Sequence, residues 1–188
     1  MNIEIERKFL LRQLPDCKWD DILIVDQFYH KSTKNYWDRY RKLESKLTQK
    51  ILYQHTIKTT ISKGVNQEIE CYLTKEAFEK NVADTFSSSR PAKYLSKIRH
   101  NFNVDNLKWE VDLFLNSTGM IIAEIEIPTL DYPLELPDFI KDNLIMEVTD
   151  AKQFSNRSIA KHIEKVNKQK KSDNKKLTDL FGSSKKTK

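Results

Sequence analysis

Charged residues at every second position are the feature that most restricts how this chain can fold. Glu4, Glu6 and Lys8 lie two residues apart, with Ile3 and Ile5 among the apolar residues between and beside them. Successive side chains of a β-strand point to opposite faces, so this spacing places the charges on one face. The same spacing recurs in further pairs: Arg39/Arg41, Glu68/Glu70, Lys97/Arg99, Glu110/Asp112 and Glu124/Glu126. The pattern predicts a mainly β protein whose strands share a charged face.

The segments that carry these pairs are short and rich in β-branched and aromatic residues. We predict strands at residues 3–9, 26–29, 37–43, 51–61, 66–73, 95–104, 107–115, 120–127 and 145–149. Turn-forming residues at Asn106 and 116–119 indicate that successive strands are antiparallel. Such a meander is typical of both a closed barrel and an open sheet.

Two stretches have helical rather than strand periodicity. Residues 75–85 follow Thr74, which can act as an N-cap, and a second helix is expected from Ser155 or Asn156 to about Lys168. The length of 188 residues and a composition of 38% hydrophobic and 32% charged residues fit one globular domain. We assign this domain to residues 1–166 and expect residues 167–188 to form a flexible Lys-rich tail.

The net charge of +6 belongs to the tail rather than to the domain. Residues 165–188 contain nine Lys and two Asp, whereas residues 1–164 carry 24 basic and 25 acidic side chains. A tail of this kind is usually a solvated appendage, and contact with nucleic acid or protein is the alternative. The chain has no apolar run of about 20 residues that would span a membrane. It also lacks a secretory signal, so a cytoplasmic location is expected.

Two interpretations account for the charged faces. In the first, one side of an ordinary antiparallel sheet faces solvent. In the second, the charges line the inside of a closed barrel. Same-sign pairs favour the second, because like charges on one strand repel unless a counter-charge lies between them. Carboxylates on one wall would attract Mg²⁺ or Mn²⁺, and Arg and Lys on another wall would bind phosphate oxygens. Such a lumen suits polyphosphate chemistry.

The order of these motifs resembles the CYTH, or triphosphate tunnel metalloenzyme, superfamily. Glu4-Ile5-Glu6-Arg7-Lys8 resembles the family's ExExK motif. Later segments are similar to its other strands in the same order: Arg39-Tyr40-Arg41, Thr56-Ile57-Lys58, Glu68-Ile69-Glu70, Lys97-Ile98-Arg99, Trp109-Glu110-Val111-Asp112, Ala123-Glu124-Ile125-Glu126 and Glu147-Val148-Thr149. The resemblance covers residues 1–163 and is closest to the short bacterial-type members.

The resemblance implies an α+β, mainly β fold: an eight-stranded antiparallel β-barrel tunnel with helices packed outside. By analogy, the metal, Mg²⁺ or Mn²⁺, would be held by carboxylates from several strands: Glu4, Glu6, Glu147, Glu124 and Glu126. The phosphates would be bound by basic residues: Lys8, Arg39, Arg41, Lys58, Lys97 and Arg99. Glu68 or Glu70 would orient the attacking water, and Lys8 also belongs to the implied catalytic set.

The implied activity is metal-dependent hydrolysis of a triphosphate by in-line attack of water, with inorganic tripolyphosphate as the first candidate substrate. A thiamine or nucleoside triphosphatase is an alternative. Another is a class IV adenylate cyclase, although its usual His-Phe pair is missing because Phe9 follows Lys8. A non-catalytic module that binds polyphosphate or nucleotide is the third. One departure concerns Asn66, which stands where the family often has Arg; Lys63 is a candidate substitute.

Overall fold

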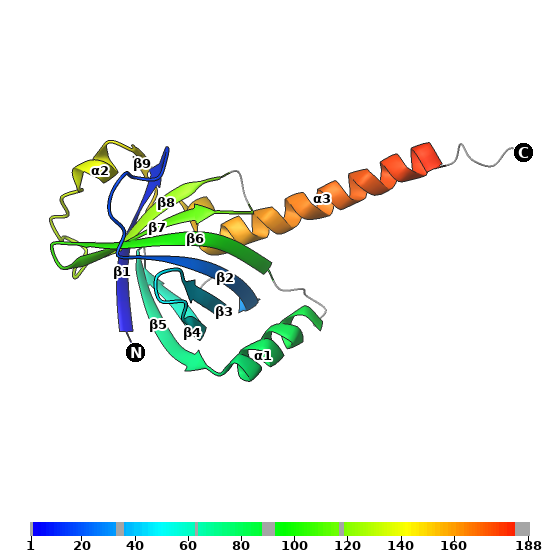
Figure 1. Ribbon diagram of the computed structural model, residues 1–188, viewed down its shortest axis with the longest axis horizontal. Helices are drawn as coiled ribbons and strands as arrows, with labels where there is room; N and C mark the ends of the chain where they lie inside the picture. Colours follow the sequence, from blue (N-terminus) through cyan, green and yellow to red (C-terminus); the bar gives the residue numbers. More distant parts are fainter. Residues whose placement is uncertain (1, 33–35, 63, 88–92, 117–118, 183–188) are drawn as a thin grey trace, which may run out of the picture.

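The computed structural model describes residues 2–32, 36–62, 64–87, 93–116 and 119–182 (Figure 1). Lys63, the candidate substitute for the missing Arg, lies outside the described residues. The strands are β1 (Asn2–Leu11), β2 (Asp21–Ser32), β3 (Tyr36–Ser45), β4 (Ile51–Ser62), β5 (Val65–Leu73), β6 (Lys93–Val104), β7 (Leu107–Phe114), β8 (Ile121–Glu126) and β9 (Leu144–Glu147). The helices are α1 (Lys75–Ser87), α2 (Asp138–Lys141), α3 (Asn156–Gly182) and a 3₁₀ turn at Lys152–Phe154.

The strands form one antiparallel sheet that closes on itself. Their order is β5-β4-β3-β2-β6-β7-β8-β1-β9, and β1 also pairs with β5. The first half of β1 pairs with β5 and closes the barrel, with Glu4 opposite Asn66. The second half of β1 pairs with β9, with Phe9 opposite Glu147. The predicted closed eight-stranded antiparallel barrel is therefore confirmed, and β9 is a short addition beside β1.

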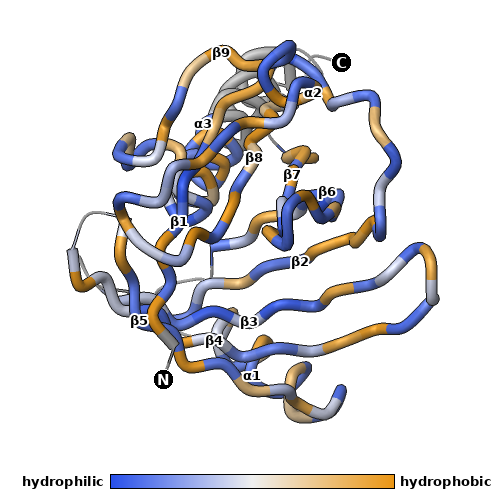
Figure 2. Tube along the Cα trace, turned by 90° about the vertical axis from the view of Figure 1, so that its left-hand side faces the viewer, coloured by the Kyte–Doolittle hydropathy of each residue, from blue (hydrophilic) through white to orange (hydrophobic). Residues whose placement is uncertain are grey.

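The main hydrophobic core lies outside the barrel wall. Hydrophilic and hydrophobic stretches alternate along the strands (Figure 2), as a two-sided wall requires. The outward residues of β1, β6, β7 and β8, such as Phe9 and Trp109, pack beneath the connection that carries α2 and its buried Ile140. On the other side, Phe78 of α1 contacts Phe28 of β2 and Tyr53 of β4. Because the apolar residues are buried on the outer side of the barrel wall, the inner face is left for charged residues.

Helix α3 packs against one end of the barrel. Tyr29 of β2, Leu95 of β6 and Phe114 of β7 are buried against the first turns of α3, where Ile159 and Ile163 point toward them. Along each strand these residues alternate with residues that point outward, so they lie on the same inner face as the charged pairs. The helix then projects from the barrel (Figure 1).

The predicted end of this helix, at about Lys168, was wrong, because α3 continues to Gly182. Lys is a good helix former, and the Lys-rich segment contains no Gly or Pro before Gly182. The domain boundary at residue 166 and the contact of the tail with nucleic acid or protein remain predictions. None of the helices in the described ranges combines the length and the apolar character that a membrane span requires.

Candidate active site in the barrel lumen

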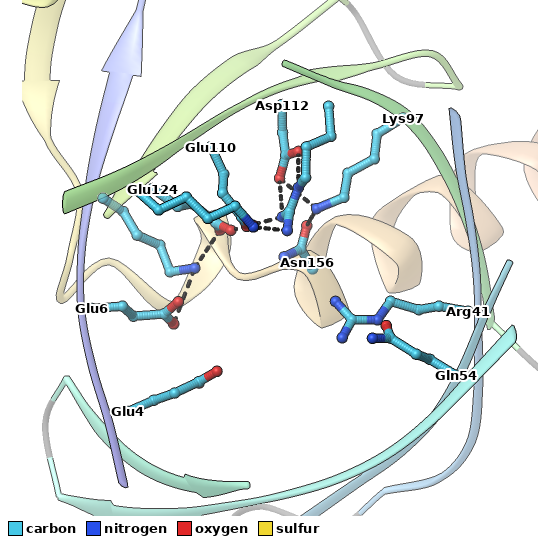
Figure 3. Close-up of polar contacts among 12 residues, drawn as sticks. Glu4, Glu6, Arg41, Gln54, Lys97, Glu110, Asp112, Glu124 and Asn156 are labelled. Atoms are coloured by element: carbon cyan, nitrogen blue, oxygen red, sulfur yellow. Dashed lines mark hydrogen bonds and ion pairs between the residues drawn. The ribbon is translucent and has the colours of Figure 1, made fainter. Parts of the chain in front are cut away.

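The barrel encloses a cavity of about 940 Å³. Figure 3 shows Glu4 and Glu6 of β1 on one wall and Arg41 and Gln54 on the opposite wall, all pointing into this space. Most of the residues that the sequence assigned to the site line it: Glu4, Glu6, Lys8, Arg39, Arg41, Lys58, Glu68, Glu70, Arg99, Glu124 and Glu126. Their convergence follows from the period-two spacing, because strand closure turns one face of every strand inward.

Lys8 is paired with carboxylates from its own strand and from β8. Its Nζ donates to Glu124 and lies 3.1 Å from Glu6 Oε1. Burial alone would lower the pKa of Lys8, but the charges of Glu124 and Glu6 raise it above its ordinary value. Lys8 is therefore a permanent cation that the protein neutralises with two of its own carboxylates.

Lys58 joins β1 and β5 in a second cluster. Its Nζ donates to Glu4 and lies 3.0 Å from Glu68 Oε1, and Arg39 Nη2 donates to the same Glu68 oxygen at 3.2 Å. Burial, opposed by Lys58 and reinforced by the nearby Glu68, raises the pKa of Glu4 to about 7. Burial would also raise the pKa of Glu68, but Arg39 and Lys58 hold it at about 2.

Arg41 and Glu70 form a third cluster on β3 and β5. Arg41 Nη2 donates to Glu70 Oε2 at 2.7 Å, and Gln54 Nε2 donates to Glu70 Oε1 at 2.7 Å. Burial and the charges of Arg39 and Arg99 lower the pKa of Arg41 to about 10. The Nε atoms of Arg39 and Arg41 are buried and have no hydrogen-bond partner within the described residues. This wall thus has crowded positive charge and unused donors, both of which an anion would satisfy.

Arg99 and Lys97 share Asp112 of β7, but only Arg99 reaches the cavity. Arg99 donates to both oxygens of Asp112, at 2.7 and 2.8 Å, and to Glu124 Oε2 at 3.1 Å. Lys97 donates to Asp112 and, at 3.4 Å, to Asn156 at the start of α3. Its side chain is only 1% exposed and does not line the cavity. Lys97 therefore lies beside Arg99 at Asp112 but, unlike the other predicted phosphate ligands, does not line the cavity.

Glu147 also lies away from the lumen. It sits opposite Phe9, an outward residue of β1, and accepts hydrogen bonds from Arg7 Nε at 2.9 Å and Arg7 Nη2 at 2.8 Å. The pKa of Glu147 is lowered chiefly by these bonds to Arg7. The structure thus separates Glu147 from the other predicted metal ligands.

The remaining carboxylates fit a hard divalent cation. Glu6 lies opposite Glu126, and Glu124 opposite Glu110, on neighbouring strands. Like charges directly opposite one another are destabilising. Burial and the neighbouring Glu110 raise the pKa of Glu126. Within the described residues no three acidic, His or Cys groups are already gathered around one point. The oxygen donors and the surplus of negative charge on this wall nevertheless match what Mg²⁺ or Mn²⁺ requires.

Several cavity residues were missed by the sequence analysis. Lys152 of the 3₁₀ turn and Arg157 and Lys161 of α3 line the cavity, and Arg157 lies over Trp37, 5.5 Å from the ring centre. A search for charges two residues apart cannot find residues on a helix, although the spacing of Arg157 and Lys161 is the one that places side chains on a common helix face. Tyr29, Gln54, Asn66, Lys108 and Glu110 also line the cavity.

Comparison with known proteins agrees with this geometry. No protein-family model matches the sequence. The chain is 35% identical over 69 residues to an inorganic triphosphatase of Acetivibrio thermocellus, a match that spans 36% of this chain and 42% of that protein. Its structure is similar to that of the inorganic triphosphatase NE1496, with a TM-score of 0.54 and 23% identity over 85% of this chain and 95% of that one. The chain has a CYTH-like triphosphate tunnel fold.

The fold is also similar to that of a conserved hypothetical protein from Pyrococcus furiosus. Here the TM-score is 0.51 and the identity 18%, over 74% of this chain and 86% of the other. The sequence match to the A. thermocellus enzyme covers less than half of that enzyme. The solved structures, by contrast, match over 85% and 74% of this chain, so the structural likeness extends over most of the fold.

Proposed function

We propose that the protein hydrolyses the terminal phosphoanhydride bond of a triphosphate in the barrel lumen, with inorganic tripolyphosphate as the first candidate substrate. One observation carries the proposal. Five cations from four strands converge on one cavity, and each is held by a lumen carboxylate: Lys8, Arg39, Arg41, Lys58 and Arg99. Such a set matches a short, highly charged polyanion better than a neutral or singly charged ligand.

The carboxylate pairs explain how the lumen tolerates its charge without substrate. A buried cation without a partner would cost several kcal/mol, so the pairs act as internal counter-ions. Phosphate oxygens can replace carboxylate oxygens at Arg and Lys with the same charge-assisted hydrogen bonds. The free Nε donors of Arg39 and Arg41 add contacts that the carboxylates do not use. Substrate binding then releases carboxylates toward the acidic wall.

The acidic wall is the proposed metal site. Glu4, Glu6 and Glu126, with Glu124 as a further ligand, would hold Mg²⁺ or Mn²⁺. When bound, the metal would neutralise phosphate charge and polarise the phosphorus centre. Glu147 stands outside this set because Arg7 holds it on the outer surface.

Glu68 and Glu70 are the candidates for orienting the attacking water. Glu68 is ionised at neutral pH because Arg39 and Lys58 offset the effect of burial and hold its pKa at about 2. A carboxylate of such low basicity orients a water molecule by accepting its hydrogen bond rather than by removing its proton. Positioning of this kind, with cations that offset the charge developing on phosphate oxygens, is the main source of catalysis in phosphoryl transfer.

The name of the A. thermocellus relative favours inorganic tripolyphosphate over the other triphosphates. A panel of tripolyphosphate, ATP and thiamine triphosphate, each assayed for phosphate release with Mg²⁺, with Mn²⁺ and with chelator, tests both substrate and metal. We expect turnover of tripolyphosphate that needs metal and is lost in Lys58→Met. The matched control is Lys75→Met on α1, where Lys75 forms an exposed pair with Glu79. Absence of phosphate release from every triphosphate would refute the proposal.

A further inference from the structure

Tyr29 occupies an unusual place in the lumen. It lies on the inner face of β2, is only 3% exposed, and lines the cavity although its ring packs with the apolar residues that meet α3. On neighbouring β3, Arg39 is directly opposite Tyr29, and Arg41 is directly opposite Gln27. The Tyr29 ring therefore packs against apolar residues, whereas its hydroxyl end is part of the cation-lined wall.

The Tyr29 hydroxyl is fixed by Gln27, whose side chain makes no other hydrogen bond to the part of the chain that the structure describes. Gln27 Nε2 donates to the Tyr29 hydroxyl oxygen at 2.5 Å, and Gln27 Oε1 has no partner within the described residues. Gln27 is completely buried. Because the Tyr29 oxygen accepts this bond, its own hydrogen remains available as a donor. A buried polar pair with a spare donor is costly unless something in the cavity accepts it.

The electrostatic surroundings keep this hydroxyl protonated. Burial raises the pKa of Tyr29, and this outweighs the lowering by Arg39, Arg41, Lys8 and Lys58. The same interactions place the hydroxyl in the electrostatic field of four of the five cations proposed to bind phosphate. An anion bound to these cations would lie in the same electrostatic field as the Tyr29 hydroxyl.

We propose that Tyr29, held in place by Gln27, donates a hydrogen bond to a phosphate oxygen of the substrate and so is a specificity-determining residue of the lumen. The proposal rests on the proposed function. The chemistry is distinct from that of the Lys cations: a neutral donor with a fixed direction distinguishes oxygen positions, whereas a Lys ammonium mainly responds to charge. Gln27 is a positioning residue, because it acts through the Tyr29 hydroxyl and does not line the cavity.

Tyr29→Phe removes only the hydroxyl and is the central test. We expect kcat/KM for tripolyphosphate to fall about 10- to 100-fold, the range for a lost hydrogen bond to a charged group. The matched control is Tyr94→Phe, which removes a hydroxyl that donates to Asp26 at 2.6 Å on the outer surface. That variant should stay within about twofold of wild type, as is usual for surface substitutions away from special features.

Gln27→Leu separates positioning from general damage to the fold. It should reproduce part of the Tyr29→Phe loss, and the double variant should lose no more than Tyr29→Phe alone, since both act through one hydrogen bond. Calorimetric binding of tripolyphosphate without divalent metal provides a readout independent of turnover. It should weaken in Tyr29→Phe and not in Tyr94→Phe.

The outcomes distinguish this inference from the proposed function. If wild type releases phosphate and Tyr29→Phe keeps its kcat/KM, the role of Tyr29 is refuted while the triphosphatase remains. If wild type binds tripolyphosphate but hydrolyses no triphosphate, the proposed function fails, and equal binding by Tyr29→Phe would then refute the inference as well. If wild type neither binds nor hydrolyses it, both fail. Additive losses in the double variant would refute the positioning role of Gln27.

Discussion

Arg99 and Asp112 form a two-pronged ion pair inside the barrel wall. Arg99 Nε and Nη2 lie 2.7 and 2.8 Å from the two Asp112 oxygens, and the Asp112 side chain is completely buried. Lys97 donates to the same carboxylate. One Asp thus compensates two buried cations, and it does so where β6, β7 and the start of α3 meet.

Asp112→Asn should therefore destabilise the fold strongly. Removing one partner of a buried ion pair typically costs about 3–5 kcal/mol, and here Lys97 would stay buried with no carboxylate of the described residues bonded to it, whereas Arg99 keeps its bond to Glu124. Urea unfolding at neutral pH measures the effect. Asp138→Asn, which breaks only the exposed pair with Lys141 at 3.2 Å, is the control and should cost less than about 1 kcal/mol. Similar losses in the two variants would contradict the structural role of Asp112.

The metal site can be tested by comparing two predicted ligands that the structure separates. Glu6→Gln should lower Mn²⁺ affinity and metal-dependent turnover by more than about 100-fold, because the loss of a direct ligand should exceed the 10- to 100-fold cost of losing an outer-shell partner. Glu147→Gln should lower neither beyond about twofold, since its carboxylate binds Arg7 on the outer surface. Calorimetry with Mn²⁺ and phosphate release provide the measurements. A large loss in Glu147→Gln would instead show that β9 rearranges and brings this carboxylate into the lumen.

Acid stability should depend on Glu110. Burial would raise the pKa of Glu110, but Arg99 and Lys108 hold it at about 2, below its ordinary value of 4.5. The unfolded chain binds this proton more readily, so the stabilisation is present above pH 4.5 and is lost as pH falls toward 2. Its size is about 3 kcal/mol as an upper estimate. Glu110→Gln should flatten the plot of unfolding free energy against pH over this window. Parallel plots for wild type and variant would exclude Glu110 as the cause.

The alternation of charge in the sequence predicted most of the lumen, because a strand's period of two fixes which side chains share a face. It favoured a closed barrel over an open sheet, and the resemblance in motif order implied the eight strands. The alternation could not predict how deep each side chain lies along the barrel axis. Lys97 and Arg99 obey the same pattern, yet Lys97 lies deeper, bonded to Asn156 of α3. Nor could it predict which face of β9 turns inward, since that depends on the register that places Glu147 opposite Phe9.

The contribution of α3 to the cavity was also invisible to strand periodicity, and it leads to a last prediction. Arg157 lines the cavity and lies over the Trp37 ring, 5.5 Å from its centre. Because it is only partly buried, we expect it to attract substrate charge without a specific role in the transition state. Arg157→Gln should therefore raise KM for tripolyphosphate about 3- to 10-fold and change kcat little, as loss of uniform binding does.

Lys168→Gln is the matched control for Arg157→Gln. It removes one positive charge from the same helix, but at an exposed position where Lys168 pairs with Glu164 at 2.6 Å and does not line the cavity. Its KM should match that of wild type. An equal rise in KM for both variants would mean that the overall charge of α3, and not its contact with the lumen, attracts the substrate. A fall in kcat for Arg157→Gln alone would place Arg157 at the reacting phosphate.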